Sequence, residues 1–285
     1  MTQRNEAVRL VHVAGYRIRM AVRAGDGTRT PLLLMNGIGA ALETFQPLVD
    51  ALDPALEVIR FDVPGVGGSP LPPRPYRFPS LCRLLGRALD DLGYSQIDVL
   101  GISWGGGLAQ QFALTERRRC RRLVLVSTGT GALMVPASPG VLVKMVSPRR
   151  YRDPGYMTSI APHLYGGSVR RDPDRLRDLL HGFARRGDGR GYALQLAAGA
   201  GWTSVPFLPL LPQRTLVLTG DDDPIIPQIN GRILAGLIRR STLHVYPGGH
   251  VELVVNPGLL VPMIETFLSA GEDRAPRRQP FRKTA

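Results

Sequence analysis

The sequence predicts an α/β fold, in which a mostly parallel central sheet is covered by helices on both faces. Short runs rich in leucine, isoleucine and valine alternate with segments of helical hydrophobic spacing, as is typical of that architecture. One run, Pro31–Met35, is apolar throughout, as expected for a strand that is buried on both faces. The alternation stops at about residue 129 and resumes at about residue 212. Together these observations predict an α/β core that carries one long insertion.

The expected strands share short runs of apolar and β-branched residues. They are Val8–Val13, Tyr16–Val22, Pro31–Met35, Glu57–Phe61, Ile97–Leu100, Leu123–Ser127, Thr215–Thr219 and Thr242–Tyr246. Ala14 and Gly15 separate the first two, which predicts a hairpin. The expected helices are Leu42–Leu52, Ser80–Leu92, Gly105–Leu114, Ile229–Ile238 and Pro257–Leu268.

Three regions are expected along the chain. Residues 1–128 and 212–270 form the core, and residues 129–211 form an insertion after the sixth strand. The insertion is rich in proline, glycine, arginine and tyrosine and has helical pieces such as Asp174–Phe183, which predicts a helical lid over a site at the strand ends. Residues 271–285 are polar and basic, and we expect this tail to be disordered.

The composition is basic, but the charge alone does not identify a binding partner. The 285 residues carry a formal net charge of +13, with arginine clusters at 117–119, 121–122, 149–150, 170–171 and in the tail. No nucleic-acid partner is expected, because no nucleic-acid motif and no basic stripe interleaved with aromatic residues accompanies the charge. A solvated basic surface is a simpler interpretation than a specific anionic partner.

The two cysteines, Cys82 and Cys120, have no cysteine or histidine at metal-ligand spacing, so no metal site is expected. They are interpreted as free thiols of a reducing compartment. Residues 1–13 lack the apolar core of a signal peptide, and no apolar run is long enough to span a membrane. We therefore expect a cytoplasmic protein.

A Gly-x-Ser-x-Gly motif at residues 101–105 follows a predicted strand and opens a predicted helix. Such a serine sits on a tight turn, where side chains at the positions of Gly101 and Gly105 would clash. The helix directs its N-terminal dipole at developing negative charge. This context resembles the α/β-hydrolase superfamily and indicates Ser103 as a nucleophile, whereas the alternative is a glycine-rich turn with an incidental serine.

A serine nucleophile needs a base, and five histidines are available. His250 follows the last predicted strand, at the edge where catalytic groups of open α/β sheets gather, so it is the predicted base. His12 lies in an opening strand, and His163 and His181 lie in the insertion. His244 lies within the last strand, where a half-buried structural role is expected.

Three carboxylates, Asp221, Asp222 and Asp223, compete for the role of the acid that orients the histidine. All three follow the strand Thr215–Thr219, between the serine and the histidine in chain order. The superfamily pattern places the acid three residues after a glycine, here Gly220, which favours Asp223 and leaves Asp222 as the alternative. The acid would fix the imidazole tautomer and stabilise the imidazolium.

An oxyanion hole requires two backbone N–H donors. One is expected from Trp104, the residue after the nucleophile, and the other from Ile38, in the loop that follows the strand Pro31–Met35. The alternative for that loop is a plain glycine-rich turn. Asp62 begins an Asp-x-x-Gly-x-Gly-x-Ser loop, and a structural role is expected for it.

Four core motifs resemble the intracellular medium-chain-length polyhydroxyalkanoate depolymerases of pseudomonads: Asn-Gly-Ile-Gly-Ala (36–40), Phe-Asp-Val-Pro-Gly-Val-Gly-Gly-Ser (61–69), Gly-Ile-Ser-Trp-Gly-Gly (101–106) and Leu-Thr-Gly-Asp-Asp-Asp-Pro (218–224). Insertion segments at 147–151, 160–162, 165–167 and 201–204 resemble that family too. Two departures are segment 192–197, which is poorer in aromatic residues, and Glu252, which replaces an apolar residue. The family's triad positions match Ser103, Asp223 and His250.

This resemblance implies a serine esterase that cleaves the polyester of storage granules in the cytoplasm and releases 3-hydroxyalkanoic acids. It implies no cofactor, and it suggests granule-surface proteins or lipids as partners. Two alternatives remain open: a carboxylesterase or lactonase for small soluble esters, with the same triad, and a non-catalytic granule-associated protein. Polyester synthases of this fold use a cysteine nucleophile, so Ser103 argues against synthesis.

Overall fold

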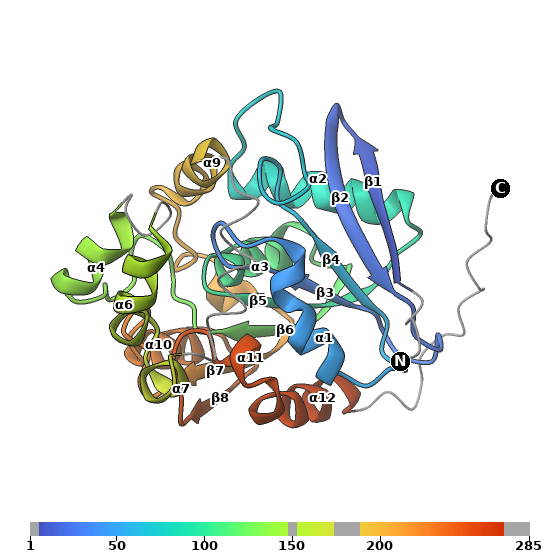
Figure 1. The fold of residues 1–285 in the computed structure, drawn as a ribbon. Helices are drawn as coiled ribbons and strands as arrows, with labels where there is room; N and C mark the ends of the chain where they lie inside the picture. Colours follow the sequence, from blue (N-terminus) through green and yellow to red (C-terminus); the bar gives the residue numbers. More distant parts are fainter. Residues whose placement is uncertain (1–5, 148–152, 174–188, 271–285) are drawn as a thin grey trace.

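The computed structural model describes residues 6–147, 153–173 and 189–270, and its core is one eight-stranded sheet (Figure 1). The strand order is β1-β2-β4-β3-β5-β6-β7-β8. The strands are β1 (Glu6–Val13), β2 (Tyr16–Arg23), β3 (Leu32–Met35), β4 (Val58–Phe61), β5 (Ile97–Ile102), β6 (Cys120–Val126), β7 (Arg214–Gly220) and β8 (Ser241–Tyr246). The pairs β1–β2 and β2–β4 are antiparallel and all other pairs are parallel, so the carboxyl ends of β3 to β8 share one edge.

Helices on the two faces of the sheet bury separate apolar cores. One core is covered by α2 (Phe78–Asp91), α3 (Trp104–Thr115) and α10 (Ile229–Leu237), and the other by α1 (Gln46–Ala51), α11 (Glu252–Val255) and α12 (Val261–Ser269). Successive side chains of a strand point to opposite faces. Leu33 and Met35 therefore join the first core, while Leu32 and Leu34 join the second. This double burial explains why the run contains no polar residue.

The predicted core elements are confirmed, and the differences lie at their ends. The predicted helix Leu42–Leu52 begins as a 3-10 turn, η1 (Leu42–Phe45), before α1. The predicted helix Pro257–Leu268 is divided into η3 (Pro257–Leu259) and α12, which carries a proline in its first turn, where the missing N–H costs nothing.

The expectation of a half-buried His244 is wrong. The side chain is exposed, because β8 is an edge strand of the sheet and alternate residues of its central part face solvent. The predicted hairpin is confirmed. Ala14 and Gly15 have φ values of 49° and 80°, and positive φ at both central residues gives the twist that a two-residue hairpin loop needs.

The chain between β6 and β7 forms α4 (Pro139–Val146), α6 (Pro154–Tyr165), α7 (Gly167–Arg171), α9 (Gly189–Gly199) and η2 (Leu208–Leu210). These helices gather on one side of the sheet in Figure 1. The predicted helix Asp174–Phe183 and the predicted disordered tail 271–285 lie outside the described residues. Of the helices that the structure describes, none combines the length and apolar character that crossing a membrane requires.

The thiols of Cys82 and Cys120 are both buried in the core, so we expect them to be unreactive toward thiol reagents in the folded protein. Burial raises the pKa of the Cys82 thiol, helped by the nearby Glu116 carboxylate, and burial with Asp98 raises the pKa of the Cys120 thiol. The folded protein therefore keeps both thiols protonated at pH values where unfolded thiols, with a pKa of about 8.5, ionise. It follows that the free energy of unfolding should decrease as pH rises above that value.

We expect Ellman's reagent at pH 8 to modify neither thiol in the native protein and both in guanidinium chloride. Glutathione in the same buffers controls for the effect of denaturant on the reagent. Immediate modification of one thiol per native chain would contradict the burial described here.

Candidate active site

Ser103 lies on a strained turn between β5 and α3. Its φ of 54° and ψ of −121° are unusual for a residue with a side chain, and two bonds hold it there. The Ser103 N–H donates to the Val126 carbonyl (3.0 Å), and the Thr128 hydroxyl donates to the Ser103 carbonyl (2.7 Å). A Cβ at Gly105 would lie 2.2 Å from the Met35 carbonyl oxygen, so this position must be glycine.

His250 and Asp223 meet at the carboxyl ends of β8 and β7. The imidazole Nδ1 lies 2.9 Å from Oδ2 and 3.1 Å from Oδ1 of Asp223, and both residues are buried. The N–H groups of Ile225 and Ile226 also donate to Asp223 Oδ1. A carboxylate held by these donors has one orientation toward the imidazole.

The other two carboxylates of this loop have different partners. Asp221 Oδ1 accepts from the Gly248 N–H (3.0 Å). Asp222 Oδ2 accepts from the Gly167 N–H (2.7 Å), and its Oδ1 lies 2.8 Å from Arg170 Nη1. Of the three neighbours, Asp223 is therefore the one whose oxygens contact the histidine.

The loop after β3 lies beside the serine. An added Cβ at Gly37 would be 3.9 Å from the Ser103 Cβ. Asn36 folds the loop, since its Oδ1 accepts from the Gly37 N–H (3.0 Å) and its Nδ2 donates to the Ala41 carbonyl (2.7 Å). Asparagine thus provides both a donor and an acceptor for one short loop.

Three backbone N–H groups of this loop have acceptors. The N–H groups with acceptors are those of Gly37, Gly39 and Ala40. In the part of the chain that the structure describes, no acceptor is found for the Ile38 N–H. The Trp104 N–H belongs to the first turn of α3, where helix geometry provides no acceptor. Both N–H groups expected to form an oxyanion hole thus lack an acceptor among the described residues, as that role requires.

The histidine loop is held by residues that sequence analysis missed. The Tyr246 hydroxyl lies 2.9 Å from the Ser127 hydroxyl and donates to the Gly249 carbonyl (3.2 Å). Burial raises the pKa of Tyr246, so this hydroxyl stays protonated as a donor. Buried Glu252 accepts from the N–H of Gly249 and, at 3.0 Å, from the hydroxyl of Ser168. An alternating strand pattern marks Tyr246 as a core residue but does not reveal its bonds.

The insertion contacts both sides of this site. From α6, the Tyr165 carbonyl accepts from the His250 N–H (2.8 Å). From α9, Gln195 accepts from the Gly39 N–H at its Oε1 (2.7 Å) and from the Trp104 indole at its backbone oxygen (2.9 Å). Gln195 carries no sequence signal, because a lone glutamine in a helix predicts only a polar surface.

Asp62 is structural, as expected. Its buried carboxylate accepts from the N–H groups of Leu42 (2.7 Å) and Gly68 (2.7 Å) and lies 3.1 Å from Arg19 Nη1. Burial raises the pKa of Asp62, and these partners oppose that shift. This carboxylate fixes the loop after β4 rather than a catalytic group.

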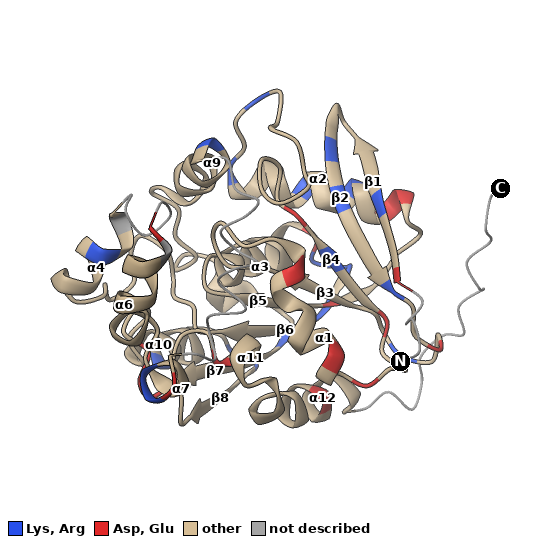
Figure 2. Ribbon diagram, in the orientation of Figure 1, with Lys and Arg blue, Asp and Glu red and all other residues tan. Residues whose placement is uncertain are grey.

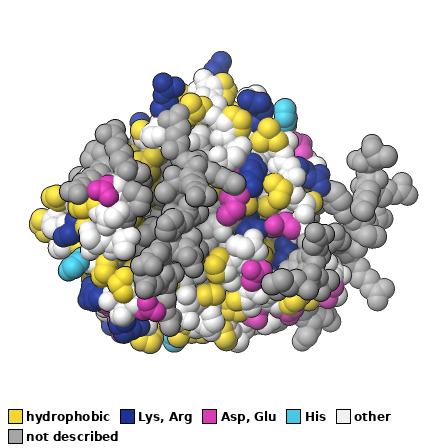
Figure 3. Space-filling model, in the orientation of Figure 1, with side chains coloured by type: hydrophobic (Ala, Val, Ile, Leu, Met, Phe, Trp, Pro, Cys, Tyr) yellow, Lys and Arg dark blue, Asp and Glu magenta, His cyan; other side chains and the backbone are white. Residues whose placement is uncertain are grey.

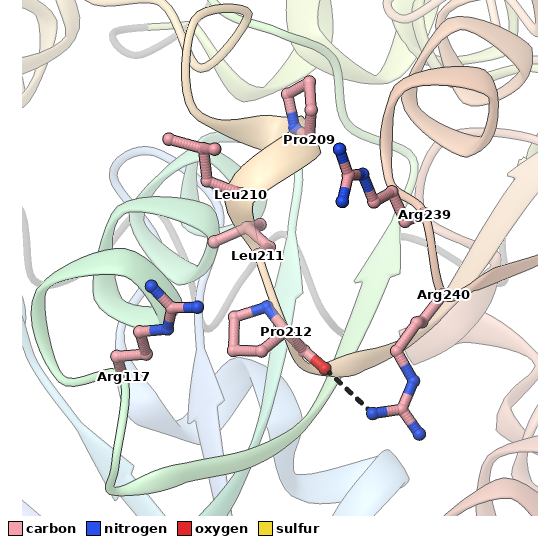
Figure 4. A pocket seen from close by; sticks show the side chains of 7 residues that line it. All are labelled: Arg117, Pro209, Leu210, Leu211, Pro212, Arg239 and Arg240. Atoms are coloured by element: carbon pink, nitrogen blue, oxygen red, sulfur yellow. Dashed lines mark hydrogen bonds between the residues drawn. The ribbon is translucent and has the colours of Figure 1, made fainter.

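A surface pocket of about 390 Å³ lies elsewhere, at the amino ends of β6, β7 and β8 (Figure 4). Its lining comprises Arg117, residues 209–212, Arg239 and Arg240, and the Arg240 side chain bonds the Pro212 carbonyl (3.4 Å). It contains none of the expected catalytic or oxyanion-hole residues. Within the described residues, no group of three or more histidine, cysteine, aspartate or glutamate side chains could hold a metal ion.

Comparisons with known proteins identify the fold family of this chain. The family model described as the alpha/beta hydrolase fold matches residues 30–257. The chain is 51% identical over 268 residues to a poly(3-hydroxyalkanoate) depolymerase of Ectopseudomonas oleovorans, covering 94% of each chain.

Solved structures share the fold. An enol-lactonase of Burkholderia xenovorans has a TM-score of 0.78 at 24% identity, over 92% of this chain and 100% of that one. A thermophilic esterase of Thermogutta terrifontis has a TM-score of 0.76 at 25% identity, over 93% and 98%. The chain therefore belongs to the α/β-hydrolase fold family and is a hydrolase.

Proposed function

We propose that this hydrolase is a serine esterase that cleaves medium-chain-length polyhydroxyalkanoate and releases 3-hydroxyalkanoic acids. The observation that carries the substrate assignment is the 51% identity to a poly(3-hydroxyalkanoate) depolymerase across 94% of both chains. The serine chemistry is supported by the Asp223–His250 contact and by the strained turn at Ser103.

In the proposed mechanism, Ser103 attacks the ester carbonyl while His250 accepts the hydroxyl proton at Nε2. Asp223, bonded to Nδ1, holds the tautomer in which Nε2 is the acceptor and stabilises the imidazolium. The N–H groups of Ile38 and Trp104 bind the oxyanion of the tetrahedral intermediate. The alcohol leaves with a proton from His250, and water then hydrolyses the acyl-enzyme with the same base.

We propose that residues 129–211 act as a lid on a core of residues 1–128 and 212–270. The contacts of Tyr165 with the histidine loop and of Gln195 with the loop after β3 support this role. A cover over the strand ends would exclude water from the oxyanion hole, which strengthens its hydrogen bonds. The same contacts would make the lid decide which acyl groups reach the serine.

The proposed location is the cytoplasm, at the surface of polyester granules and their coat of proteins or lipids. Lysine and arginine are distributed over many elements in Figure 2, and basic and apolar side chains adjoin on the face in Figure 3. With a formal net charge of +13, such a surface favours anionic interfaces. A small-ester hydrolase is the second candidate, because the enol-lactonase and the esterase share this fold.

The substrate is tested by Ser103→Ala beside the wild type. We expect wild type to release 3-hydroxy acids from amorphous medium-chain granules and to hydrolyse a soluble octanoyl ester. The variant should lose about a millionfold in kcat on the ester, because the nucleophile is missing. Wild-type cleavage of the soluble ester alone would leave the serine chemistry intact and move the assignment to a small-ester hydrolase.

The acid is tested by comparing Asp223→Asn with Asp222→Asn. Asparagine at 223 can donate to Nδ1 and favour the wrong tautomer, so kcat on the octanoyl ester should fall about 10⁴-fold. Asparagine at 222 keeps an oxygen for the Gly167 N–H, so kcat should stay within about tenfold of wild type. The reverse order of effects would identify Asp222 as the acid.

Granule docking is tested with Ser103→Ala, which binds without degrading its support. We expect the fraction that sediments with isolated granules to fall as sodium chloride rises from about 50 mM to about 500 mM, because salt screens exposed charges. Bovine serum albumin serves as an acidic control protein. Binding that does not respond to salt would rule out an electrostatic contribution to docking.

A further inference from the structure

Helix α9 has an unusual buried face. Its buried residues are Gly191, Gln195 and Ala198, spaced so that they share one side of the helix, whereas Leu196 is 53% exposed. Gln195 itself is 0% exposed. A helix that docks by the hydrophobic effect places leucine inward and glutamine outward, so the reversed arrangement points to a specific polar role for this amide.

Two hydrogen bonds connect Gln195 to the two segments that carry the expected oxyanion donors. Its Oε1 accepts from the N–H of Gly39, which follows Ile38 in the chain, and its backbone oxygen accepts from the indole of Trp104. The ring of Tyr192, one turn earlier, packs on the same loop, since a Cβ at Gly39 would lie 3.1 Å from Tyr192 Cδ2. The amide is therefore anchored within one residue of the atoms that hold the reacting carbonyl.

The other half of this amide has no partner within residues 6–147, 153–173 and 189–270. Gln195 Nε2 is buried and finds no acceptor among the residues that the structure describes. Buried amide N–H groups in folded proteins are almost always paired, because an unpaired one loses its hydrogen bonds to water without replacement. A buried donor left over next to the loop that carries Ile38 is an expected feature where the missing acceptor belongs to the substrate.

We propose that Gln195 Nε2 donates a hydrogen bond to the oxygen on the third carbon of the bound acyl unit. This inference rests on the proposed function, since that oxygen distinguishes a 3-hydroxyalkanoyl unit from a simple fatty acyl group. It is a bridging ester oxygen within the polymer and a hydroxyl at its end. In either form it lies two carbons from the carbonyl that the oxyanion donors bind, close to an amide that is anchored at Gly39.

Gln195 thus has two separable roles. Oε1 positions the loop that carries Ile38, and this role affects every ester equally. Nε2 recognises the third-carbon oxygen, and this role affects only esters that carry one. The ratio of kcat/KM values for two esters that differ in that oxygen alone isolates the second role from the first.

The test uses p-nitrophenyl 3-hydroxyoctanoate and p-nitrophenyl octanoate with Gln195→Met and Gln195→Glu. Methionine has a similar length and no donor or acceptor, while glutamate keeps an acceptor for the Gly39 N–H and loses the donor. We expect both variants to lose about tenfold more kcat/KM on the hydroxy ester than on the plain ester, the size of one neutral hydrogen bond. Leu196→Ala, on the exposed side of the same helix, should leave the ratio unchanged.

Equal losses on both esters would overturn the proposal and leave Gln195 as a positioning residue only, and no loss on either ester would also overturn it. Thermal unfolding of each variant shows whether a loss reflects misfolding, and the ratio remains informative in the variant that folds. Release of hydroxy acids from granules by the wild type tests the proposed function separately. A selective loss together with inactivity on granules would retain the role of Gln195 and reject the polymer as substrate.

Discussion

The tight turn at Ser103 is the constraint on which the rest of the site depends. A positive φ at a residue with a side chain costs on the order of 1–3 kcal/mol, and the surrounding structure must hold it. The bonds from Val126, at the end of β6, and from Thr128, in the loop after it, do so. A second requirement is the absence of a side chain at Gly105, which lets α3 begin against the backbone of β3. The two neighbours of β5 in the sheet, β3 and β6, therefore provide the contacts that hold the turn at Ser103.

This central position explains why the remaining groups can converge. The parallel strands β3, β5, β7 and β8 all end at the same edge, so their loops bring Ile38, Trp104, Asp223 and His250 toward one place. Each loop is then fixed by its own bonds: Asn36 folds the first, and Tyr246 and Glu252 fix the last. A preorganised set of donors does not have to reorient during the reaction, which is the main source of electrostatic catalysis.

The core was predicted correctly from the sequence, and candidate site residues could be named, because both depend on local patterns. Buried parallel strands are continuous apolar runs, and the Ser103 turn demands glycines at fixed spacing. The supporting contacts could not be predicted, because they join residues far apart in the chain: Gln195 with Gly39, and Glu252 with Ser168. The observed start of α12 differs from the predicted one, and a proline occupies its first turn. The exposure of His244 was predicted wrongly because the pattern of a single strand does not show that the strand lies at the edge of the sheet.

In the proposed mechanism, chemistry and selectivity come from different parts of this chain. The expected nucleophile, base, acid and oxyanion donors come from core loops and from the first turn of α3. The insertion contacts these segments through backbone atoms of Tyr165, Gly167 and Gln195. Backbone contacts of this kind hold the insertion in place under many side-chain choices. The buried amide of Gln195 is different, because its side chain reaches the loop beside Ile38. On this proposal, a change at this one position alters acyl preference while the expected triad stays in place, in keeping with a fold that hosts many functions.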